Sequence, residues 1–305
     1  MISVFGSVNM DLVAYVESAP ALGETVTGRA FRTVPGGKGA NQAIAAARAG
    51  AEVAFLGAVG EDAFGPQMRR TLAESGVDVT GLRTVPGVSG IAQIVVDDQG
   101  GNSIIVVPGA NGTVTAPSEA ELEVIARSDV LLLQLELPIE AVTAAARAAR
   151  AAGTTVILTP APVQPLPGEL LDAVDILVAN EHEAAAITGR PDHEEALREL
   201  KARVDWVIIT LGSRGALTAA PGTGPALHVE APKVRAVDTT AAGDTFVGAL
   251  AVAHVERWSP DRAVRFAGAA AALSVQREGA STSMPTRAEI DRSLAGDVPP
   301  PDEHR

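Results

Sequence analysis

The sequence predicts an α/β fold: a doubly wound, mostly parallel central sheet flanked by helices, with a small antiparallel β flap beside it. From Glu119 onward, short apolar runs typical of buried strands alternate with longer runs of helical periodicity. Such alternation favours parallel strands joined by right-handed helical crossovers. Residues 12–34 and 90–108 instead contain short alternating runs broken by turn-forming residues, and these two segments predict the flap.

Each element is expected from its local pattern. Before the alternating region we expect buried strands at 2–7 and 52–59, an alanine-rich helix that opens at 35–42 and ends before Gly50, and a helix through Glu74. Beyond it we expect strands at 130–135, 155–158, 176–178 and 206–210, and helices at 139–152, 169–173, 181–188 and 193–202. A last strand-like run, from His228 to Val237, leads into a helical run that ends near Trp258.

The chain of 305 residues is long enough for one large α/β domain with an ample core. Neither an internal repeat nor a low-complexity linker divides it, so residues 1–295 are expected to form a single domain that carries the flap. Residues 296–305 contain three consecutive prolines and are expected to be a disordered tail.

The composition narrows the classes of partner and chemistry. The formal net charge of −13 argues against a nucleic-acid or anionic-membrane partner. The chain has no Cys, which excludes disulfides, thiol chemistry and Cys-ligated metal sites. The N-terminus lacks the basic stretch of a signal peptide, and no apolar run approaches transmembrane length, so a cytoplasmic protein is expected.

Residues 237–246 carry the strongest chemical signal. Ala241, Ala242 and Gly243 suit the first turn of a helix whose backbone comes close to a ligand, where unpaired N–H groups and the helix dipole favour an anion. The carboxylates of Asp238 and Asp244 bracket this turn, and phosphoryl transfer to a hydroxyl needs such a group to take a proton. The alternative is a plain helix start capped by Asp and Thr.

Polar residues also follow several predicted strands. The glycine-rich helix entry at 35–42 is neither a Walker A loop nor a dinucleotide fingerprint, but it places Lys38 and Asn41 in a first helical turn. Residues 178–183 and 210–215 follow strands, and so does the segment from Gln134 to Glu136, on the edge where open α/β sheets bind ligands. Each of these motifs alone also fits a helix cap or a tight turn. The His residues lack ligand spacing, and neither a zinc pattern nor a Ser/His/Asp arrangement stands out.

The order of the motifs is more specific than any one of them. Asn-x-Asp at 9–11, Gly-Gly-Lys-Gly-Ala-Asn at 36–41, Asn-Glu-x-Glu at 180–183, Thr-Leu-Gly-Ser-Arg-Gly at 210–215 and Asp-Thr-Thr-Ala-Ala-Gly-Asp at 238–244 resemble the ribokinase family. This family belongs to the wider phosphofructokinase-B (PfkB) group of sugar kinases, and the resemblance covers residues 2–294. It implies ATP-dependent phosphorylation of D-ribose at O5. A family kinase for another sugar or nucleoside (fructose, deoxyribose, adenosine) and a catalytically silent sensor of sugar or nucleotide remain alternatives.

The resemblance implies a role for each matching residue. Asp244 resembles the catalytic base, and the backbone of Ala241, Ala242 and Gly243 resembles the anion hole for the γ-phosphate. The positions that match sugar-binding residues are Asn9, Asp11, Gly37, Lys38, Asn41, Glu136 and Asp244, with Ala92 and Ile94 as apolar flap residues over the sugar. The nucleotide contacts are matched by Asn180, Thr210, Gly212 and Gly243.

The resemblance also implies two cations and a partner chain. Glu183 matches the acid that holds Mg²⁺ through water. The loop for an activating K⁺ is matched by Asp238, Thr240, Ser274, Arg277, Gly279 and Ser283, mostly through carbonyl oxygens. An exposed edge strand in the flap would favour pairing with a second copy, and the family also points to a homodimer.

Three residues depart from the family pattern. Thr159 stands before Pro-Ala-Pro where the family usually has Asn, and Gly268 stands near the adenine site where Asn or His is common. Gln93 replaces a usually apolar flap residue, but strand alternation should direct it away from the sugar. None of these changes removes a predicted catalytic group, although Gly268 is expected to loosen the hold on adenine or to alter the nucleotide preference.

Overall fold

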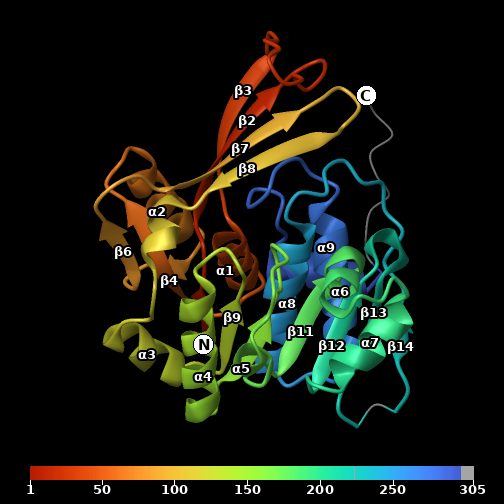
Figure 1. Cartoon of the computed structure of the whole chain (residues 1–305). Helices are drawn as coiled ribbons and strands as arrows, with labels where there is room; N and C mark the ends of the chain where they lie inside the picture. The colour runs from red at the N-terminus through yellow and green to blue at the C-terminus, as the bar shows by residue number, and fades with distance from the viewer. Residues whose placement is uncertain (223, 297–305) are drawn as a thin grey trace.

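A computed structural model describes residues 1–222 and 224–296 (Figure 1). In this part of the chain, ten strands form a central sheet in the order β14-β13-β12-β11-β10-β9-β1-β4-β5, with β6 paired to β4. These strands are β1 (Ile2–Phe5), β4 (Val53–Gly60), β5 (Val77–Asp78), β6 (Leu82–Val85), β9 (Val130–Leu133), β10 (Thr155–Leu158), β11 (Ile176–Asn180), β12 (Trp206–Thr210), β13 (Ala216–Ala219) and β14 (Leu227–Val229). All pairs are parallel except β12–β13 and β13–β14. The predicted fold class is confirmed.

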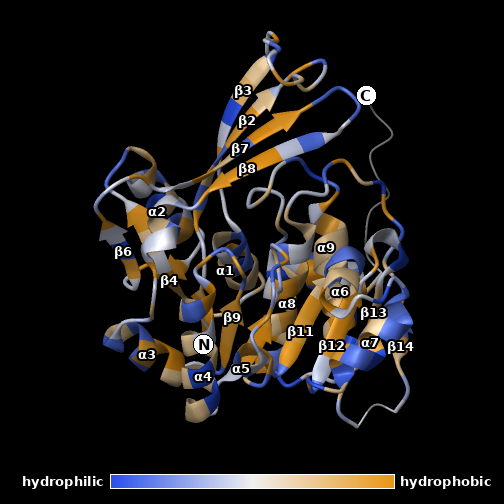
Figure 2. Ribbon diagram, viewed as in Figure 1, coloured by the Kyte–Doolittle hydropathy of each residue, from blue (hydrophilic) through white to orange (hydrophobic). Residues whose placement is uncertain are grey.

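Helices cover both faces of the sheet and enclose one apolar core on each. Alternate residues of a strand enter opposite cores, as Leu132 and Leu133 of β9 do. One core includes α1 (Lys38–Arg48), α2 (Phe64–Glu74), α8 (Ala242–Val255), α9 (Pro260–Ser274) and α10 (Arg287–Leu294). The other includes α3 (Glu119–Ala126), α4 (Ile139–Ala152), α5 (Gly168–Leu171), α6 (Glu181–Thr188) and α7 (His193–Lys201). Figure 2 shows the apolar strands between helices whose outer surfaces are polar.

The helices α1 and α8 pack closely because Gly248 has no side chain. A Cβ atom at this position would lie 2.6 Å from the Ala45 Cβ and 2.8 Å from both the Ala46 N and the Gln42 O. This close packing brings the first turns of α1 and α8 together, and both turns carry predicted site residues.

A second, four-stranded sheet projects beyond the central one (Figure 1). We call it the flap; its order is β3-β2-β7-β8, from β2 (Asn9–Tyr15), β3 (Ala30–Gly36), β7 (Gly90–Val96) and β8 (Asn102–Val107). The outer pairs are antiparallel, as predicted, but β2 and β7 run parallel. Both of these strands rise from the central domain in the same direction, β2 shortly after β1 and β7 shortly after β6, which accounts for the parallel pair.

The structure corrects the strand predicted from His228 to Val237. The strand β14 ends at Val229, and residues 230–237 have no regular structure. Pro232 lacks the N–H that would continue the ladder, and this segment lines a cavity instead. The strands β5, β6 and β13 and the helices α9 and α10 were not predicted.

Two predictions about domain organisation, the C-terminal tail and the single domain, stay open. Of the predicted tail, residues 297–305 lie outside the described residues. The assignment of residues 1–295 to a single domain stays a prediction. Within the described ranges, no helix combines the length and the apolar character needed to cross a membrane.

Candidate active site

The first turn of α8 is an open helix N-terminus. Ala241, the residue before the helix, has a left-handed backbone with φ of 58°, an uncommon conformation for a residue with a side chain. No side chain of the described residues caps the helix. In the alternative interpretation, Asp and Thr side chains cap this helix. Asp238 and Thr240 instead bind each other, because the Thr240 N–H and hydroxyl both donate to Asp238 Oδ1. The Ala242 N–H donates to Thr239 O at 3.2 Å, and within the described residues the N–H groups of Gly243 and Asp244 stay available to an anion.

Asp244 lies in this turn, only 8% exposed, and accepts two side-chain hydrogen bonds from α1. Asn41 Nδ2 donates to its Oδ2 and Gln42 Nε2 donates to its Oδ1, each at 3.1 Å. Burial raises the pKa of Asp244 to about 6, although Lys38 and the two amides act in the opposite direction. A carboxyl group with this pKa is ionised at neutral pH and is basic enough to accept a proton from a bound hydroxyl.

Charged groups from four segments surround Asp244. Burial, with Glu136 and Asp244, raises the pKa of Asp11 on β2 to about 7. Burial lowers the pKa of Lys38, but Asp244, Glu136, Glu183 and Asp11 outweigh it and raise that pKa, so the ammonium group stays charged. Glu136 also accepts hydrogen bonds from the Lys38 backbone N–H at 2.9 Å and from the Ser7 hydroxyl. The predicted sugar-binding acids thus share one site with Asp244.

Two asparagines leave unpaired polar groups at this site. Asn9 is buried, and its Oδ1 accepts a 2.7 Å hydrogen bond from Asn111 Nδ2, so its own Nδ2 is directed elsewhere as a donor. Asn41 Oδ1 is buried without a partner among the described residues, so it can accept a hydrogen bond from a ligand hydroxyl. Gly36 and Gly37 let the backbone pass close to β2, since a Cβ atom on Gly36 would lie 2.4 Å from Asp11 Oδ2. Such a set of donors and acceptors suits a polyol.

The flap places apolar residues on the same face as Asp11. The register pairs Asp11 with Ala92 and Val13 with Ile94, and paired residues share a face of a sheet. Gln93 lies between them in β7 and therefore on the opposite face, as predicted. Ala92 and Ile94 are thus positioned to cover a ligand beside Asp11.

A cavity of about 420 Å³ lies on the other side of the α8 N-terminus. Its walls include Thr210, Gly212, Gly243 and Gly268, together with the irregular segment from Glu230 to Ala236. A Cβ atom on Gly268 would meet nothing within 4 Å, so this departure from the family leaves that end of the cavity open. Gly243 lines the cavity, while its neighbour Asp244 faces Asp11, Lys38, Asn41 and Glu136, which we call the polar cluster. The cavity and the polar cluster therefore meet at this turn.

Asn180 and Glu183 form a capping box at the start of α6. Asn180 Oδ1 accepts from the Glu183 N–H, and Glu183 accepts from the Asn180 N–H and Nδ2, each at 2.8 Å. Asn180 is not a lining residue of the cavity, although it pairs with Thr210 in the sheet. Burial raises the pKa of Glu183, whereas Lys38 lowers it, so Glu183 and Lys38 interact across the site. Within the described ranges no group of three or more His, Asp or Glu residues could hold a metal.

The residues expected to bind K⁺ come from two loops that the structure joins. Asp238 Oδ2 accepts from the Gly279 N–H at 2.9 Å, and the Val237 and Asp238 N–H groups donate to Val275 O. Burial raises the pKa of Asp238, but hydrogen bonds from Thr240 and Gly279 outweigh it and hold that pKa below its ordinary value. The carboxylate is therefore ionised.

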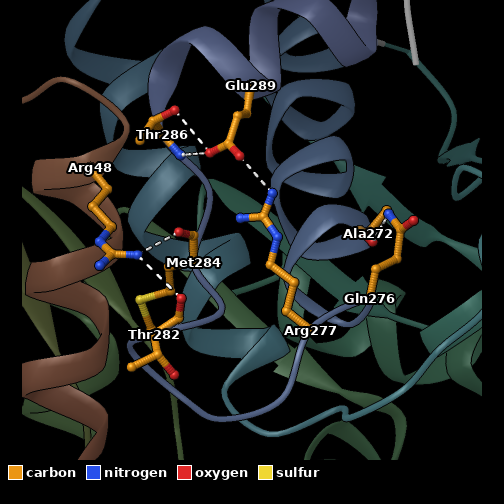
Figure 3. Close-up of polar contacts among 8 residues, drawn as sticks. All are labelled: Arg48, Ala272, Gln276, Arg277, Thr282, Met284, Thr286 and Glu289. Carbon is orange, nitrogen blue, oxygen red and sulfur yellow. Dashed lines mark hydrogen bonds and ion pairs between the residues drawn. The ribbon is translucent and has the colours of Figure 1, made fainter. Parts of the chain in front are cut away.

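The side chains of the second loop bind their neighbours in the fold. Ser274 and Ser283 donate to Ala271 O and Ala280 O, and Arg277 forms a 2.6 Å ion pair with Glu289. Figure 3 shows this ion pair together with Arg48 of α1, which donates to the Met284 carbonyl at 2.7 Å. These contacts hold the loop against α1 and α10.

A model of the family described as pfkB family carbohydrate kinase matches residues 1–287. The chain belongs to this family of sugar kinases. The Haemophilus influenzae ribokinase is 42% identical over 299 residues, which cover 94% of this chain and 96% of that protein. The Bacillus subtilis ribokinase is 43% identical over 297 residues, which cover 96% and 99%. The structure of Arabidopsis thaliana ribokinase complexed with ribose and ATP has a TM-score of 0.91 and 38% identity, and covers 96% of this chain and 98% of that chain. The family resemblance expected from the motifs is confirmed.

Three residues that were not predicted as site residues also contact the predicted ones. Gln42 contacts Asp244, Asn111 holds Asn9, and Ser7 holds Glu136. Gln42 adjoins the predicted Asn41, but the other two are joined to their partners only by the fold, because Asn111 and Asn9 are 102 residues apart.

Proposed function

We propose that this chain phosphorylates D-ribose at O5 with ATP as the donor. The single observation that supports it most strongly is the position of Asp244. This buried carboxylate faces hydrogen-bond donors and acceptors that suit a polyol, while the adjacent Gly243 lines a cavity large enough for a nucleotide. The ribokinases of the comparison, all near 40% identity, and the ribose and ATP complex of the Arabidopsis protein support ribose and ATP as the substrates.

In the proposed mechanism Asp244 accepts the proton of the 5-hydroxyl as its oxygen attacks the γ-phosphorus of ATP in line. Asn9, Asp11, Asn41 and Glu136 bind the other sugar oxygens. The N–H groups of Gly243 and Asp244, which have no partner among the described residues, stabilise the charge that develops on the transferred phosphoryl group. Lys38 interacts with the carboxylates of Asp11, Glu136, Asp244 and Glu183. Its ammonium group adds a positive charge near the transferred phosphoryl group.

Two cations complete the proposal. Glu183 would hold Mg²⁺ through water, and a single carboxylate fits an ion that keeps its hydration shell and binds mainly to phosphates. Mg²⁺ would supply charge neutralisation during the transfer. The loops around Asp238 and Gly279 would hold K⁺ through carbonyl oxygens and the ionised Asp238, and would stabilise the adjoining helix start. We expect turnover to fall when K⁺ is replaced by tetramethylammonium.

The flap supports a homodimer as the working form. Strand β8 is an exposed edge, and the outer face of the flap carries exposed Phe31, Ile105 and Val107. Exposed apolar edges of this kind are covered in most natural proteins. A second copy of the flap would cover this face while the inner face, with Ala92 and Ile94, closes over the sugar.

The proposal is tested by measuring ADP release with ATP and Mg²⁺ across D-ribose, 2-deoxyribose, fructose and adenosine, with K⁺ or tetramethylammonium as the monovalent cation. We expect turnover mainly on ribose, ribose 5-phosphate as the product by ³¹P NMR, and stimulation by K⁺. Turnover on another acceptor would retain the kinase and reject ribose as its substrate. Binding of sugar and nucleotide without turnover on any acceptor would favour the silent sensor.

A further inference from the structure

Two buried amides behind Asp244 take no part in the mechanism above. Gln42 of α1 and Gln134, which follows β9, are 0% and 1% exposed. Gln134 Nε2 donates to Gln42 Oε1 at 2.6 Å. Gln42 Nε2 then donates to Asp244 Oδ1 at 3.1 Å and to Thr159 Oγ1 at 3.2 Å. A hydrogen-bonded chain therefore runs from the carboxyl edge of the central sheet to Asp244.

The chain gives the Gln42 amide a single orientation. Its carbonyl oxygen is occupied by the Gln134 donor, and its two N–H bonds have two acceptors, Asp244 and Thr159. A flipped Gln42 amide would place its oxygen against the carboxylate and its NH₂ group against the NH₂ group of Gln134. Thr159, which departs from the family pattern, supplies the acceptor for the second N–H bond.

The Gln42 donor differs from the other groups that face Asp244. On the α1 side, Lys38 and Asn41 face both Asp244 and the polar cluster, and Asn41 still has an unpaired oxygen for a ligand. Glu136 and Asp11 bring negative charge to the same cluster. Gln42 has all its polar atoms bound within the protein, so a bound sugar leaves its contact with Asp244 in place.

We propose that Gln42, oriented by Gln134, is a positioning residue that fixes the Asp244 carboxylate in its ionised form, with Oδ2 turned toward the acceptor hydroxyl. This inference rests on the proposed function in treating Asp244 as the base. A hydrogen bond donated to a carboxylate stabilises its charged form, so loss of the Gln42 donor favours protonation.

The test compares Gln42→Met, which keeps the side-chain length but removes the donor, with Gln134→Met, which leaves Gln42 without its orienting partner. In Gln42→Met we expect the acid limb of the kcat/KM profile to move up by about one pH unit and kcat to fall at least about tenfold, with KM for ribose changed by less than about threefold. Gln134→Met should shift the limb in the same direction but less. The control Thr159→Val removes one bond of the chain and keeps the donor to Asp244, so its limb should coincide with that of the parent.

A second readout does not depend on the acceptor sugar. In protein labelled with ¹³C at the aspartate carboxyls, the resonance lost in Asp244→Asn reports the titration of Asp244 in the free protein. A titration midpoint raised in Gln42→Met supports the inference even where ribose proves to be the wrong acceptor. An Asp244 midpoint that is the same in Gln42→Met and the parent overturns it, and so does an equal shift in Thr159→Val. Absence of turnover on ribose by the parent rejects the proposed function alone.

Discussion

At the scale of single residues, the site concentrates ionisable groups that are unfavourable for folding. Asp11 and Asp244 are held in a buried cluster where burial and neighbouring carboxylates raise their pKa values. A carboxyl group whose pKa is higher in the folded than in the unfolded protein binds more protons when folded. Its unfavourable contribution therefore grows as the pH rises from the unfolded pKa toward the folded one. Such groups are kept where a function requires them.

Asp11→Asn should accordingly stabilise the free protein at alkaline pH. The folded pKa of Asp11 is about 7 against an ordinary value of 3.8, and the described contacts give its carboxylate no hydrogen bond to lose. We expect a gain of about 2 kcal/mol at pH 8 after allowance for solvent screening, which shrinks as the pH falls toward 4. Thermal melts at pH 8 and pH 4.5 measure it. Equal gains at both pH values, or a loss at pH 8, would contradict the assigned environment.

The same variant should bind ribose more weakly, with KM raised about tenfold, because an amide replaces a charged acceptor of sugar hydroxyls. Isothermal titration with ribose separates this effect from any change in turnover.

At the scale of elements, the site is made by two helix starts, those of α1 and α8, pressed together at Gly248. The motif 238–244 predicted that α8 opens at an anion-binding turn, since Ala-Ala-Gly and two acids are local features. The chain from Gln134 through Gln42 to Asp244 could not be predicted, because Gln134 and Gln42 are 92 residues apart and meet only when α1 packs on the sheet. The end of β14 was also missed, since the apolar residues after Val229 line a cavity rather than a strand.

Gly248→Ala should separate the two helix starts. The added methyl group would lie within 3 Å of α1 backbone atoms, which cannot move as a flexible side chain would. We expect a loss of about 1–3 kcal/mol in the free energy of unfolding, and a fall in kcat because Asn41 and Gln42 move away from Asp244. Urea unfolding measures the first effect and steady-state kinetics the second.

The matched control is Gly268→Ala, also a glycine in a helix, where a Cβ atom meets nothing within 4 Å. Its stability should equal or exceed that of the parent. Gly248→Ala as stable as Gly268→Ala and as active as the parent would contradict the assigned α1–α8 contact.

At the scale of the whole molecule, the residues of the proposed sugar and nucleotide sites adjoin strands of the central sheet, and the flap projects beyond that sheet (Figure 1). The alternation of strands and helices predicted this arrangement, as did the turn residues of the flap. The parallel pairing of β2 with β7 was not predicted, since it depends on where both strands leave the central domain. The outer apolar face of the flap is the feature that a partner copy would explain.

Ile105→Lys should therefore convert the proposed homodimer to a monomer. The side chain is 64% exposed on the outer face of the flap, so the substitution places a charge in the proposed interface without disturbing a core. Light scattering after size-exclusion chromatography measures the mass of each species. The control Leu294→Lys changes a similarly exposed apolar residue, 45% exposed on α10, and should leave the mass unchanged. A monomeric parent would reject the dimer, as would an Ile105→Lys protein that remains dimeric.

The central claim is that Asp244 is the base of phosphoryl transfer to a sugar hydroxyl. Rapid-quench single-turnover kinetics of Asp244→Asn, with saturating ribose, ATP, Mg²⁺ and K⁺, tests it most directly. Loss of a general base should slow the transfer step by about 10²–10⁴-fold, while both ligands still bind because Asn41, Lys38 and the nucleotide cavity are intact. A transfer rate in Asp244→Asn within about tenfold of the parent rate would show that another group takes the proton.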